Sequence, residues 1–525
     1  MGPLKLLNTY WEADAPVPAR ARLAIAGPRC QKPRANWPAA TPFVIASGAG
    51  RAAIHCGLCC PLDGFATLAM TKDQGIALSA PANTDPTPRR FLPAGPLKGS
   101  IRVPGDKSIS HRAIMLGALA VGETQVTGLL EGEDVLATAA AMRAMGALVE
   151  RTGEGAWRVH GVGVGALLQP QAPLDMGNSG TSTRLLMGLV ASHAIETRFF
   201  GDASLSKRPM GRVIEPLSQM AAAFDASAGG RLPLTVRGAN PAVPITYRLP
   251  VASAQVKSAI LLAGLNTPGI TTVIEPVPTR DHSERMLRGF GAELEVETDS
   301  AGVRTIRLHG EADLYPQTIE VPGDPSSAAF FIVAALIVPG SELTIQNVGL
   351  NPTRAGIITV LRQMGGSIEE LNRREVGGEP VADLLVRHSV LSGIAVDPAI
   401  APSMIDEFPA LFVAAALAEG TTVTTGLDEL RVKESDRISA MAAALAAIGA
   451  RVTETEDGLT ITGSGGEPLQ GGGPISTHLD HRIAMSMAVA GIASRDGVEV
   501  DDTRPISTSF PNFITLLEGV AVQPE

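Results

Sequence analysis

The sequence predicts an α/β protein in which one strand–helix–strand–helix–strand unit occurs six times, as two domains of three units each. The first observation is a repeated segment, because Val-Pro-Gly-Asp-Lys-Ser at residues 103–108 returns as Val-Pro-Gly-Asp-Pro-Ser at residues 321–326. The second is that weaker copies start near residues 177, 253, 405 and 479. The starts therefore lie roughly 70 to 80 residues apart, which is too long for a solenoid repeat. The third is that each copy places polar residues at the start of an apolar helical run.

Length and composition agree with several well-filled domains. A chain of 525 residues with 45% hydrophobic and 18% charged residues can form two to four domains. The net charge of -10 disfavours binding to nucleic acid by bulk charge. The longest apolar stretch of the repeat region, Ala328–Val338, stops at Pro339 and is shorter than the roughly 20 residues of a membrane span. We therefore expect a soluble protein with no nucleic acid and no membrane as partner.

Residues 1–90 differ from the repeat region and are expected to form a poorly ordered N-terminal extension. They show no sustained period of 2 or 3.6, and basic residues outnumber acidic ones among the first 60. All the cysteines of the chain lie here, and they are Cys30, Cys56, Cys59 and Cys60. No Cys/His pair with ligand spacing follows, which favours unpaired thiols over half a zinc site. Met70 is our hypothesis for the natural start of the protein.

Units one and four are the clearest copies of the repeat. After its Val-Pro-Gly-Asp segment, each has an Ala/Leu/Ile-rich run that predicts a buried helix, followed by a glycine turn. A short strand comes next, at residues 124–127 in unit one and 342–345 in unit four. A second helix and a Met-Gly-Ala or Met-Gly-Gly turn then lead into the last strands of each unit.

The other four units keep a polar helix start but vary its residues. They begin with Gly-Asn-Ser-Gly-Thr at 177–181, Ser-Ala-Gln-Val-Lys at 253–257, Ile-Asp-Glu-Phe-Pro at 405–409 and Leu-Asp-His-Arg-Ile-Ala-Met at 479–485. If the three helices of each domain point their N-termini into a shared cleft, six sets of free N–H groups and positive dipole ends face one cavity. Such a cavity suits a ligand with several negative charges.

Some of these residues also have a purely structural interpretation. Asp106, Asp324 and Asp480 stand where helix N-caps are expected. The segment 433–437, Lys-Glu-Ser-Asp-Arg, would ordinarily be a solvated helix start with local ion pairs.

No nucleotide loop or metal site is predicted from the remaining motifs. Residues 161–165, Gly-Val-Gly-Val-Gly, lack the glycine that a dinucleotide loop needs at its sixth position, which favours a turn. Gly105–Ser108 lacks the P-loop pattern and gives no support to ATP hydrolysis. His478 and His481 are more typical of cap and packing groups at a helix start than of metal ligands.

Six segments carry a resemblance to a known family. They are Pro104–Arg112, Gly177–Thr181, Lys207–Arg212, Ser253–Lys257, Arg431–Arg437 and Asp480–Met485. In this order, from about residue 90 to the C-terminus, they resemble the 3-phosphoshikimate 1-carboxyvinyltransferases, also called EPSP synthases. Arg280–Glu284 and Asn351–Arg354 further resemble the bacterial class II subgroup, which is associated with tolerance to glyphosate.

The resemblance implies the enolpyruvyl transferase fold. This fold has two inside-out α/β domains, each made of three βαβαββ-type repeats whose parallel helices are buried, and two crossing strands join the domains. The expected boundaries are 104–319 for an upper domain, and 91–103 with 320–525 for a lower domain.

The resemblance also implies a reaction. The family transfers the enolpyruvyl group of phosphoenolpyruvate to the 5-hydroxyl of shikimate 3-phosphate, and releases phosphate by addition and elimination through a tetrahedral ketal. The product, 5-enolpyruvylshikimate 3-phosphate, leads to chorismate and the aromatic amino acids. No metal or redox cofactor is implied, and the expected protein is a cytoplasmic monomer.

Motif matching implies a role for each catalytic residue. Asp406 would be the base at the hydroxyl, Glu434 the proton donor, and Lys107 would lie between the two substrates. Because the two carboxyls have separate roles, we expect their pKa values to be pushed apart.

The same matching implies two sets of binding residues, rich in the Arg and Lys that suit phosphates and carboxylates. For shikimate 3-phosphate they are Lys107, Ser108, Arg112, Ser253, Ala254, Gln255, Arg280, Asp406 and Lys433. For phosphoenolpyruvate they are Lys107, Gly180, Thr181, Arg208, Arg437 and Arg482.

Two positions depart from the family pattern. Residues 508–511, Thr-Ser-Phe-Pro, lack the lysine that class I members have before Thr-Phe-Pro. Gly180 stands where the glyphosate-tolerant relatives have alanine, so sensitivity to glyphosate stays open.

Three alternatives are weighed against this resemblance. UDP-N-acetylglucosamine 1-carboxyvinyltransferases typically use a loop cysteine, and no cysteine follows Cys60. An RNA 3'-phosphate cyclase would need a basic surface, which an acidic repeat region does not favour. A silent paralogue would have lost Lys107, Asp406 or Glu434, and all three are present.

Overall fold

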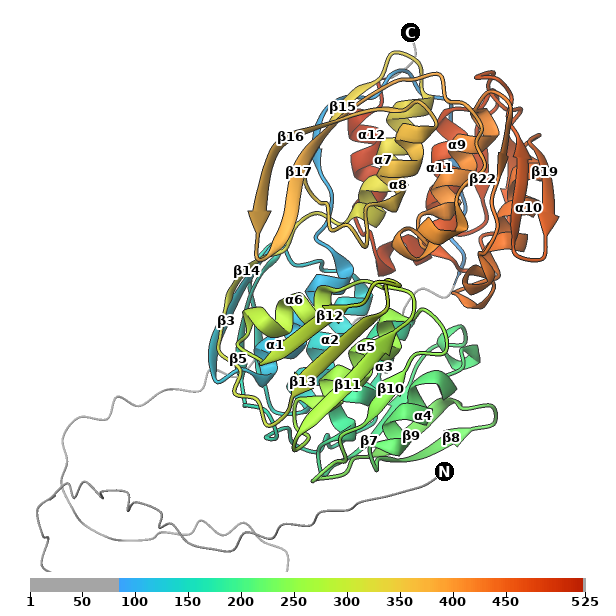
Figure 1. Cartoon of the computed structure of the whole chain (residues 1–525). Coiled ribbons are helices and arrows are strands. Elements are labelled where there is room, and N and C mark those ends of the chain that lie inside the picture. Colours follow the sequence, from blue (N-terminus) through green and yellow to red (C-terminus); the bar gives the residue numbers. More distant parts are fainter. Residues whose placement is uncertain (1–84, 523–525) are drawn as a thin grey trace, which may run out of the picture. The chain divides into compact units, whose positions relative to one another are not determined.

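The protein is described by a computed structural model of residues 85–522, in which six sheets surround two hydrophobic cores. We call the core built from residues 109–321 the first core, and the core built from residues 91–103 and 328–520 the second core. In Figure 1 the elements of the first core run from blue to green, and those of the second are mainly yellow to red.

The three sheets of the first core share one pattern. Three antiparallel strands lie side by side, and a fourth strand pairs parallel at one edge. In the first of these sheets the strand order is β14 (Thr318–Glu320), β3 (Gly122–Thr127), β5 (Ala156–Gly161) and β4 (Leu148–Gly153). In the second it is β6 (Leu174–Asp175), β7 (Glu196–Phe200), β9 (Arg231–Arg237) and β8 (Ala223–Ser227). In the third it is β10 (Thr246–Arg248), β11 (Ile270–Glu275), β13 (Arg304–His309) and β12 (Leu294–Thr298).

The sheets of the second core vary the same pattern. Their strand orders are β16 (Ser367–Val376), β17 (Glu379–Arg387), β15 (Glu342–Gly349) and β2 (Lys98–Arg102); β18 (Thr421–Val423), β20 (Gly458–Thr462) and β19 (Arg451–Thr455); and β1 (Arg89–Phe91), β22 (Val498–Val500) and β21 (Gly472–Ile475). Since β1 comes from the start of the described chain, it completes the sheet of the last unit by pairing antiparallel to β22.

Each unit contributes one inner and one outer helix. The inner helices are α1 (Lys107–Leu119), α3 (Gly180–Ala191), α5 (Ala254–Gly264), α7 (Pro325–Ile337), α9 (Phe408–Leu417) and α11 (His481–Ile492). The outer helices are α2 (Glu133–Ala144), α4 (Gly211–Gln219), α6 (His282–Gly289), α8 (Gly356–Gln363), α10 (Arg437–Ala447) and α12 (Phe513–Val520). Four short 3-10 helices, η1 (Leu205–Lys207), η2 (Pro398–Ser403), η3 (Asp428–Val432) and η4 (Arg504–Thr508), complete the described elements.

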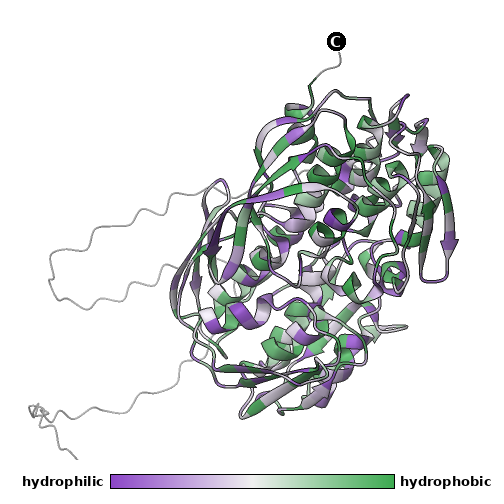
Figure 2. Cartoon of the chain, turned by 45° about the horizontal axis from the view of Figure 1, so that its top comes forward, coloured by the Kyte–Doolittle hydropathy of each residue, from purple (hydrophilic) through white to green (hydrophobic). Residues whose placement is uncertain are grey.

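The sequence explains which helices lie inside. In α7 and α9 apolar residues occur on all sides, and every residue except Ile337 is buried, as expected for a helix with no polar face. In α4 the apolar residues form one stripe, so only Val213, Pro216 and Leu217 are buried. Figure 2 shows hydrophobic green along the inner helices, whereas the strands alternate green and purple.

The chain passes between the cores twice, at neighbouring points. Strand β2 pairs with β15 of the second core before the chain enters α1, and β14 pairs with β3 of the first core before the chain enters α7. At the crossing, Asp106 N donates to Pro322 O at 2.8 Å and Asp324 N donates to Pro104 O at 2.9 Å. Only glycine fits at Gly105, because a Cβ there would lie 1.9 Å from the carbonyl oxygen of Gly128.

The six-unit repeat predicted from the sequence is confirmed by this topology, and the short strands predicted at 124–127 and 342–345 lie within β3 and β15. The predicted turn at 161–165 follows β5. Residues 1–84 hold the cysteines and Met70, and the expectations about them fall outside the described residues. Strand β1 begins at Arg89, inside the segment assigned to the extension. Within residues 85–522, no helix is both long and apolar enough to span a membrane.

Candidate functional site

A cavity of about 1030 Å³ lies where the inner helices of both cores begin. Its lining includes first-turn or capping residues of α1, α3, α5, α7 and α11, and Asp406 two residues before α9. The starts of five inner helices, together with Asp406 ahead of α9, therefore line one cavity, as the condition stated from the sequence requires. The arrangement directs free backbone N–H groups and positive dipole ends toward the same space, which favours an anionic ligand.

The helix starts are fixed by side-chain caps. Asp106 accepts a hydrogen bond from Ile109 N, Asp324 from Ser326 N, and Asp480 from Arg482 N. Ser179 and Ser253 cap α3 and α5 in the same way. The structural interpretation of the three aspartates as caps is confirmed, and Asp324 also lines the cavity.

Nine cationic side chains line the cavity within the described chain. They are Lys107, Arg184, Arg208, Arg212, Arg280, Arg354, Lys433, Arg437 and Arg482. They come from both cores, so a ligand bound among them contacts both. Arg and Lys in this number can hold more than one phosphate or carboxylate.

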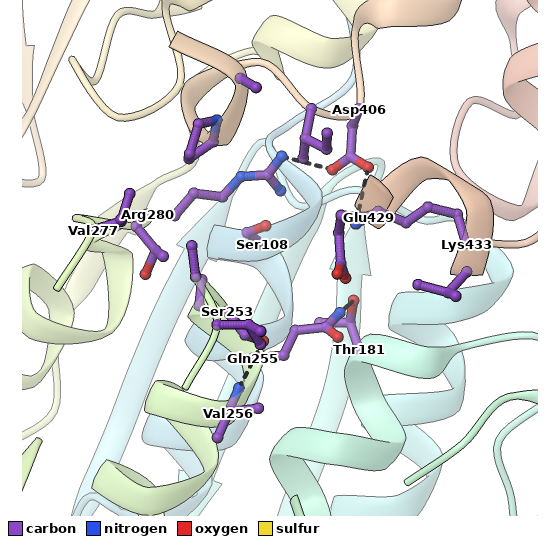
Figure 3. Close-up of a pocket in the computed structure, with 18 of the residues that line it drawn as sticks. Ser108, Thr181, Ser253, Gln255, Val256, Val277, Arg280, Asp406, Glu429 and Lys433 are labelled. Carbon is purple, nitrogen blue, oxygen red and sulfur yellow. Dashed lines mark hydrogen bonds and ion pairs between the residues drawn. The ribbon is translucent and has the colours of Figure 1, made fainter. Parts of the chain in front are cut away.

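Asp406 lies among four of these cations. Arg280 donates from Nη2 to its Oδ2 at 2.6 Å, and Lys433 Nζ lies 3.6 Å from its Oδ1 (Figure 3). Arg437 Nη1 donates to Oδ1 at 3.2 Å, and Arg482 Nη1 donates to the backbone oxygen of Asp406 at 2.8 Å. Burial raises the pKa of Asp406, but the charges of Lys433, Arg280 and the two other arginines lower it well below its ordinary value.

Glu434 also lines the cavity, where two arginines hold its carboxylate. Arg437 donates from Nη2 to its Oε2 at 2.6 Å, and Arg208 donates from Nη1 to its Oε1 at 3.3 Å. Burial raises the pKa of Glu434, whereas Arg437 and Arg208 lower it well below its ordinary value. The pKa values of both carboxyls therefore shift in the same direction, because cations of the same lining surround both Asp406 and Glu434, and the expected separation of the two pKa values stays a prediction.

Arg437 connects the two carboxyls to the start of α11. Its side chain is 1% exposed, and its Nε donates to Asp480 Oδ2 at 2.8 Å. Burial of Arg437 lowers its pKa, but Asp480, Glu434 and Asp406 together raise it above its ordinary value. The expectation of a solvated helix start at 433–437 is wrong at Arg437, since tertiary packing of α10 on α11 buries this guanidinium.

Lys107 lines the cavity and contacts both cores. Its Nζ lies 2.8 Å from Asp134 Oδ2, and its backbone N donates to Asp324 Oδ2 at 3.1 Å. Both partners line the same cavity. The ammonium is thus held at the first turn of α2, and the backbone of Lys107 at the cap of α7.

Almost all residues predicted for the site line the cavity. These are Lys107, Ser108, Gly180, Thr181, Arg208, Ser253, Ala254, Gln255, Arg280, Asp406, Lys433, Glu434, Arg437 and Arg482. Arg112 is not among the lining residues. It donates to Ser108 O at 2.9 Å, Ser258 Oγ at 2.7 Å and Ser283 Oγ at 2.8 Å, and burial lowers its pKa to about 10. The structure therefore places Arg112 outside the lining, where it contacts the backbone of Ser108.

Several charged or polar lining residues were given no role by sequence reasoning. Arg184 lies one helical turn after Gly180 on α3, and it donates to Gln255 Oε1 at 3.0 Å, so the i, i+4 spacing could have found it. Arg354 belongs to a motif quoted above, but its place beside Asp324 depends on how loops of the second core pack. Asp134 and His481 also line the cavity.

The histidine of the cavity is uncharged near neutral pH. Burial and the neighbouring charge of Lys107 lower the pKa of His481 to about 3. Within residues 85–522, no group of three or more His, Cys, Asp or Glu side chains is placed to hold a metal ion.

The comparisons with known proteins agree with this geometry. The family model for EPSP synthase (3-phosphoshikimate 1-carboxyvinyltransferase) matches residues 92–517. The 3-phosphoshikimate 1-carboxyvinyltransferase of Novosphingobium aromaticivorans is 78% identical over 435 residues, which is 82% of this chain and 99% of the relative. That of Sphingopyxis alaskensis is 72% identical over 438 residues, covering 83% of this chain and 98% of the relative.

Solved structures give the same result. An EPSP synthase from Acinetobacter baumannii superposes with a TM-score of 0.74 at 48% identity, over 83% of this chain and 98% of that one. The enolpyruvyl transferase NikO of Streptomyces tendae, at 18% identity, has a TM-score of 0.65 over 83% of this chain and 98% of its own, and supports the fold alone. The predicted enolpyruvyl transferase fold is thus confirmed, and the chain belongs to the EPSP synthase family.

Proposed function

We propose that the chain transfers the enolpyruvyl group of phosphoenolpyruvate to the 5-hydroxyl of shikimate 3-phosphate, giving 5-enolpyruvylshikimate 3-phosphate and phosphate. The observation that carries the proposal is the cavity in which Asp406 and Glu434, each held by arginines, face a space lined by the starts of the inner helices. Two anionic substrates and two positioned carboxyls are what this reaction requires.

Shikimate 3-phosphate would bind on the side of Asp406. Ser253, Gln255 and Arg280 come from the first core, and Asp406 and Lys433 from the second. Figure 3 shows Ser108 and Ser253 between Arg280 and Gln255, and Gln255 beside Thr181, to whose Oγ1 it donates at 3.0 Å. The complete proposed set is Lys107, Ser108, Arg112, Ser253, Ala254, Gln255, Arg280, Asp406 and Lys433. Arg112 would act through Ser108, because its guanidinium donates to the Ser108 carbonyl oxygen.

Phosphoenolpyruvate would bind on the side of Glu434. The proposed contacts are Lys107, Gly180, Thr181, Arg208, Arg437 and Arg482. Gly180 is the first residue of α3, where a missing side chain lets a small anion approach backbone N–H groups. Arg208 and Arg437 both donate to Glu434, so they can share their charge with a bound anion.

The two carboxyls would handle the protons of addition. As the 5-oxygen bonds to C2 of phosphoenolpyruvate, Asp406 accepts the hydroxyl proton and Glu434 gives a proton to the methylene carbon, which becomes a methyl group. A bound anion on Arg208 and Arg437 weakens their hold on the Glu434 carboxylate, which raises its pKa and lets it carry that proton.

Elimination would reverse the proton transfers. Glu434 takes a proton back from the methyl group, the C2–phosphate oxygen bond breaks, and the departing phosphate takes the proton held by Asp406. All atoms are then accounted for, and Lys107 lies beside both reacting substrates to stabilise developing charge.

We also propose that the two cores act as two domains, with boundaries at 104–319 and at 91–103 with 320–525. The chain passes between them only at residues 103–107 and 321–325 within the described range, which suits a hinge. Binding at a site shared by both would draw them together and exclude water. The protein is proposed to act as a cytoplasmic monomer on small-molecule substrates, in the route to chorismate and the aromatic amino acids.

The proposal is tested by phosphate release. Purified protein receives phosphoenolpyruvate with shikimate 3-phosphate, and a parallel sample receives UDP-N-acetylglucosamine as acceptor. We expect release only with shikimate 3-phosphate. Release only with the sugar nucleotide, or none from folded protein in either sample, would refute the proposed function.

A further inference from the structure

A buried polar cluster joins the two cores behind the cavity. Asp281 and His282 begin α6 of the first core, and Glu379 begins β17 of the second. His282 Nδ1 and Glu379 Oε1 lie 2.8 Å apart, and their side chains are 2% and 5% exposed. Arg285 adds a surface contact between the cores, because its Nη1 donates to Gly378 O at 2.7 Å.

Asn351 is the centre of this cluster. Its Nδ2 donates to Asp281 Oδ1 at 2.7 Å and to Glu379 Oε2 at 2.8 Å, so one amide group contacts both cores. Its Oδ1 accepts from Thr353 N at 2.9 Å and from Thr353 Oγ1 at 2.7 Å. Asn351 is 2% exposed and every polar atom of its side chain has a partner. Only an amide serves here, because a carboxylate cannot donate to two carboxylates.

The cluster adjoins Arg280 in the sequence. Arg280 precedes Asp281, and its guanidinium reaches across the cavity to Asp406 of the second core at 2.6 Å. On its other side, Thr279 Oγ1 donates to Glu275, which is paired with Lys257 at 3.0 Å inside the first core. Consecutive Cα atoms are about 3.8 Å apart, so anchoring both neighbours fixes the base of the Arg280 side chain.

Resting on the function proposed above, we propose that Asn351, with Asp281, His282 and Glu379, is a positioning cluster that sets how Arg280 reaches Asp406 and shikimate 3-phosphate. None of these four cluster residues lines the cavity, whereas Arg280 does, so the cluster acts through Arg280. The segments 280–284 and 351–354, which are far apart in the chain, then form one functional unit. Loss of the cluster should change binding of shikimate 3-phosphate more than binding of phosphoenolpyruvate.

The test is a double-mutant cycle with Asn351→Ala and Arg280→Ala in the full chain. We expect Asn351→Ala alone to raise the Kd and KM for shikimate 3-phosphate by roughly tenfold, with the KM for phosphoenolpyruvate within about twofold. In the Arg280→Ala background, Asn351→Ala should add less than about threefold, because its effect passes through Arg280. Equal losses in both backgrounds would overturn the proposal.

A second variant and a control distinguish a loss of positioning from a general loss of folding. Glu379→Gln keeps the side-chain shape, and we expect a smaller change of the same kind, selective for shikimate 3-phosphate. Asn266→Ala removes a partly buried amide that donates to Ser192 O at 2.6 Å within the first core, and it should leave both KM values unchanged. Equal changes for both substrates in Glu379→Gln would overturn the positioning role. Absence of turnover in the unchanged protein would instead refute the proposed function itself, and the inference with it.

Discussion

The replacement Lys257→Met should destabilise the protein strongly. The Lys257 ammonium lies 3.0 Å from Glu275 Oε1 and 2.7 Å from Glu284 Oε1, and the three side chains are 0%, 0% and 1% exposed. Methionine has a similar length without the charge, so the variant leaves two carboxylates buried beside each other. Breaking a buried ion pair by removing one partner costs about 3–5 kcal/mol. At roughly 2–4 °C per kcal/mol, Tm should fall by about 6 to 20 °C.

The assay is thermal and urea unfolding followed by circular dichroism. An exposed ion pair of the same core gives the matched control: Arg237 Nε lies 2.7 Å from Glu196 Oε2, with side chains 54% and 53% exposed. Arg237→Met should cost less than about 1 kcal/mol, because solvent screens the pair.

A triple variant tests whether the two unpaired carboxylates cause the loss of stability. The triple variant Lys257→Met, Glu275→Gln, Glu284→Gln removes the uncompensated charges and should regain most of the lost stability. A Tm for Lys257→Met within about 2 °C of the unchanged protein would refute the reasoning. So would a triple variant less stable than Lys257→Met alone.

Three other predictions concern the cavity. Glu434→Gln should bind both substrates but turn over roughly 10²- to 10⁴-fold more slowly, as measured by phosphate release, and unchanged turnover would exclude it as proton donor. Gly180→Ala should raise the KM for phosphoenolpyruvate, because its Cβ would lie 2.9 Å from Arg184 Nη1 and 3.1 Å from Arg208 Nη1; an unchanged KM would show that both arginines move aside. The lowered pKa of Asp406 means that its ionised form stabilises the folded protein above about pH 4 and that this contribution is lost as pH falls further. Asp406→Asn should therefore weaken the fall in stability below pH 4 in acid titration, and an unaltered acid transition would contradict this.

The repeat and the helix starts could be predicted because their signals are local. A glycine turn, a capping Asp or Ser and an apolar run identify each inner helix without knowledge of its neighbours, as at Asp106 and Ser253. The repetition of the unit also indicated that the helix starts could meet, because equivalent units place equivalent helix ends together. The residues matched by motif consequently line one cavity, apart from Arg112.

Apart from Arg184, the misses depend on tertiary contacts. The pairing of Lys257 with Glu275 and Glu284 joins three elements, and no sequence spacing indicates it. The direction in which the pKa values of Asp406 and Glu434 shift depends on which cations surround them, and the sequence did not indicate that both would be lowered. Burial of Arg437 likewise comes from the packing of α10 on α11, although its neighbours in the sequence are polar.

The central claim is that addition precedes elimination, with a carboxyl of the cavity protonating the methylene carbon. It is tested most directly by running the reaction in D₂O and examining the product by proton NMR. The methylene carbon of phosphoenolpyruvate becomes a methyl group and then loses a proton or a deuteron. The account therefore predicts deuterium in the vinylic CH₂ group of 5-enolpyruvylshikimate 3-phosphate. Product formed at the normal rate with no deuterium at that position would contradict it.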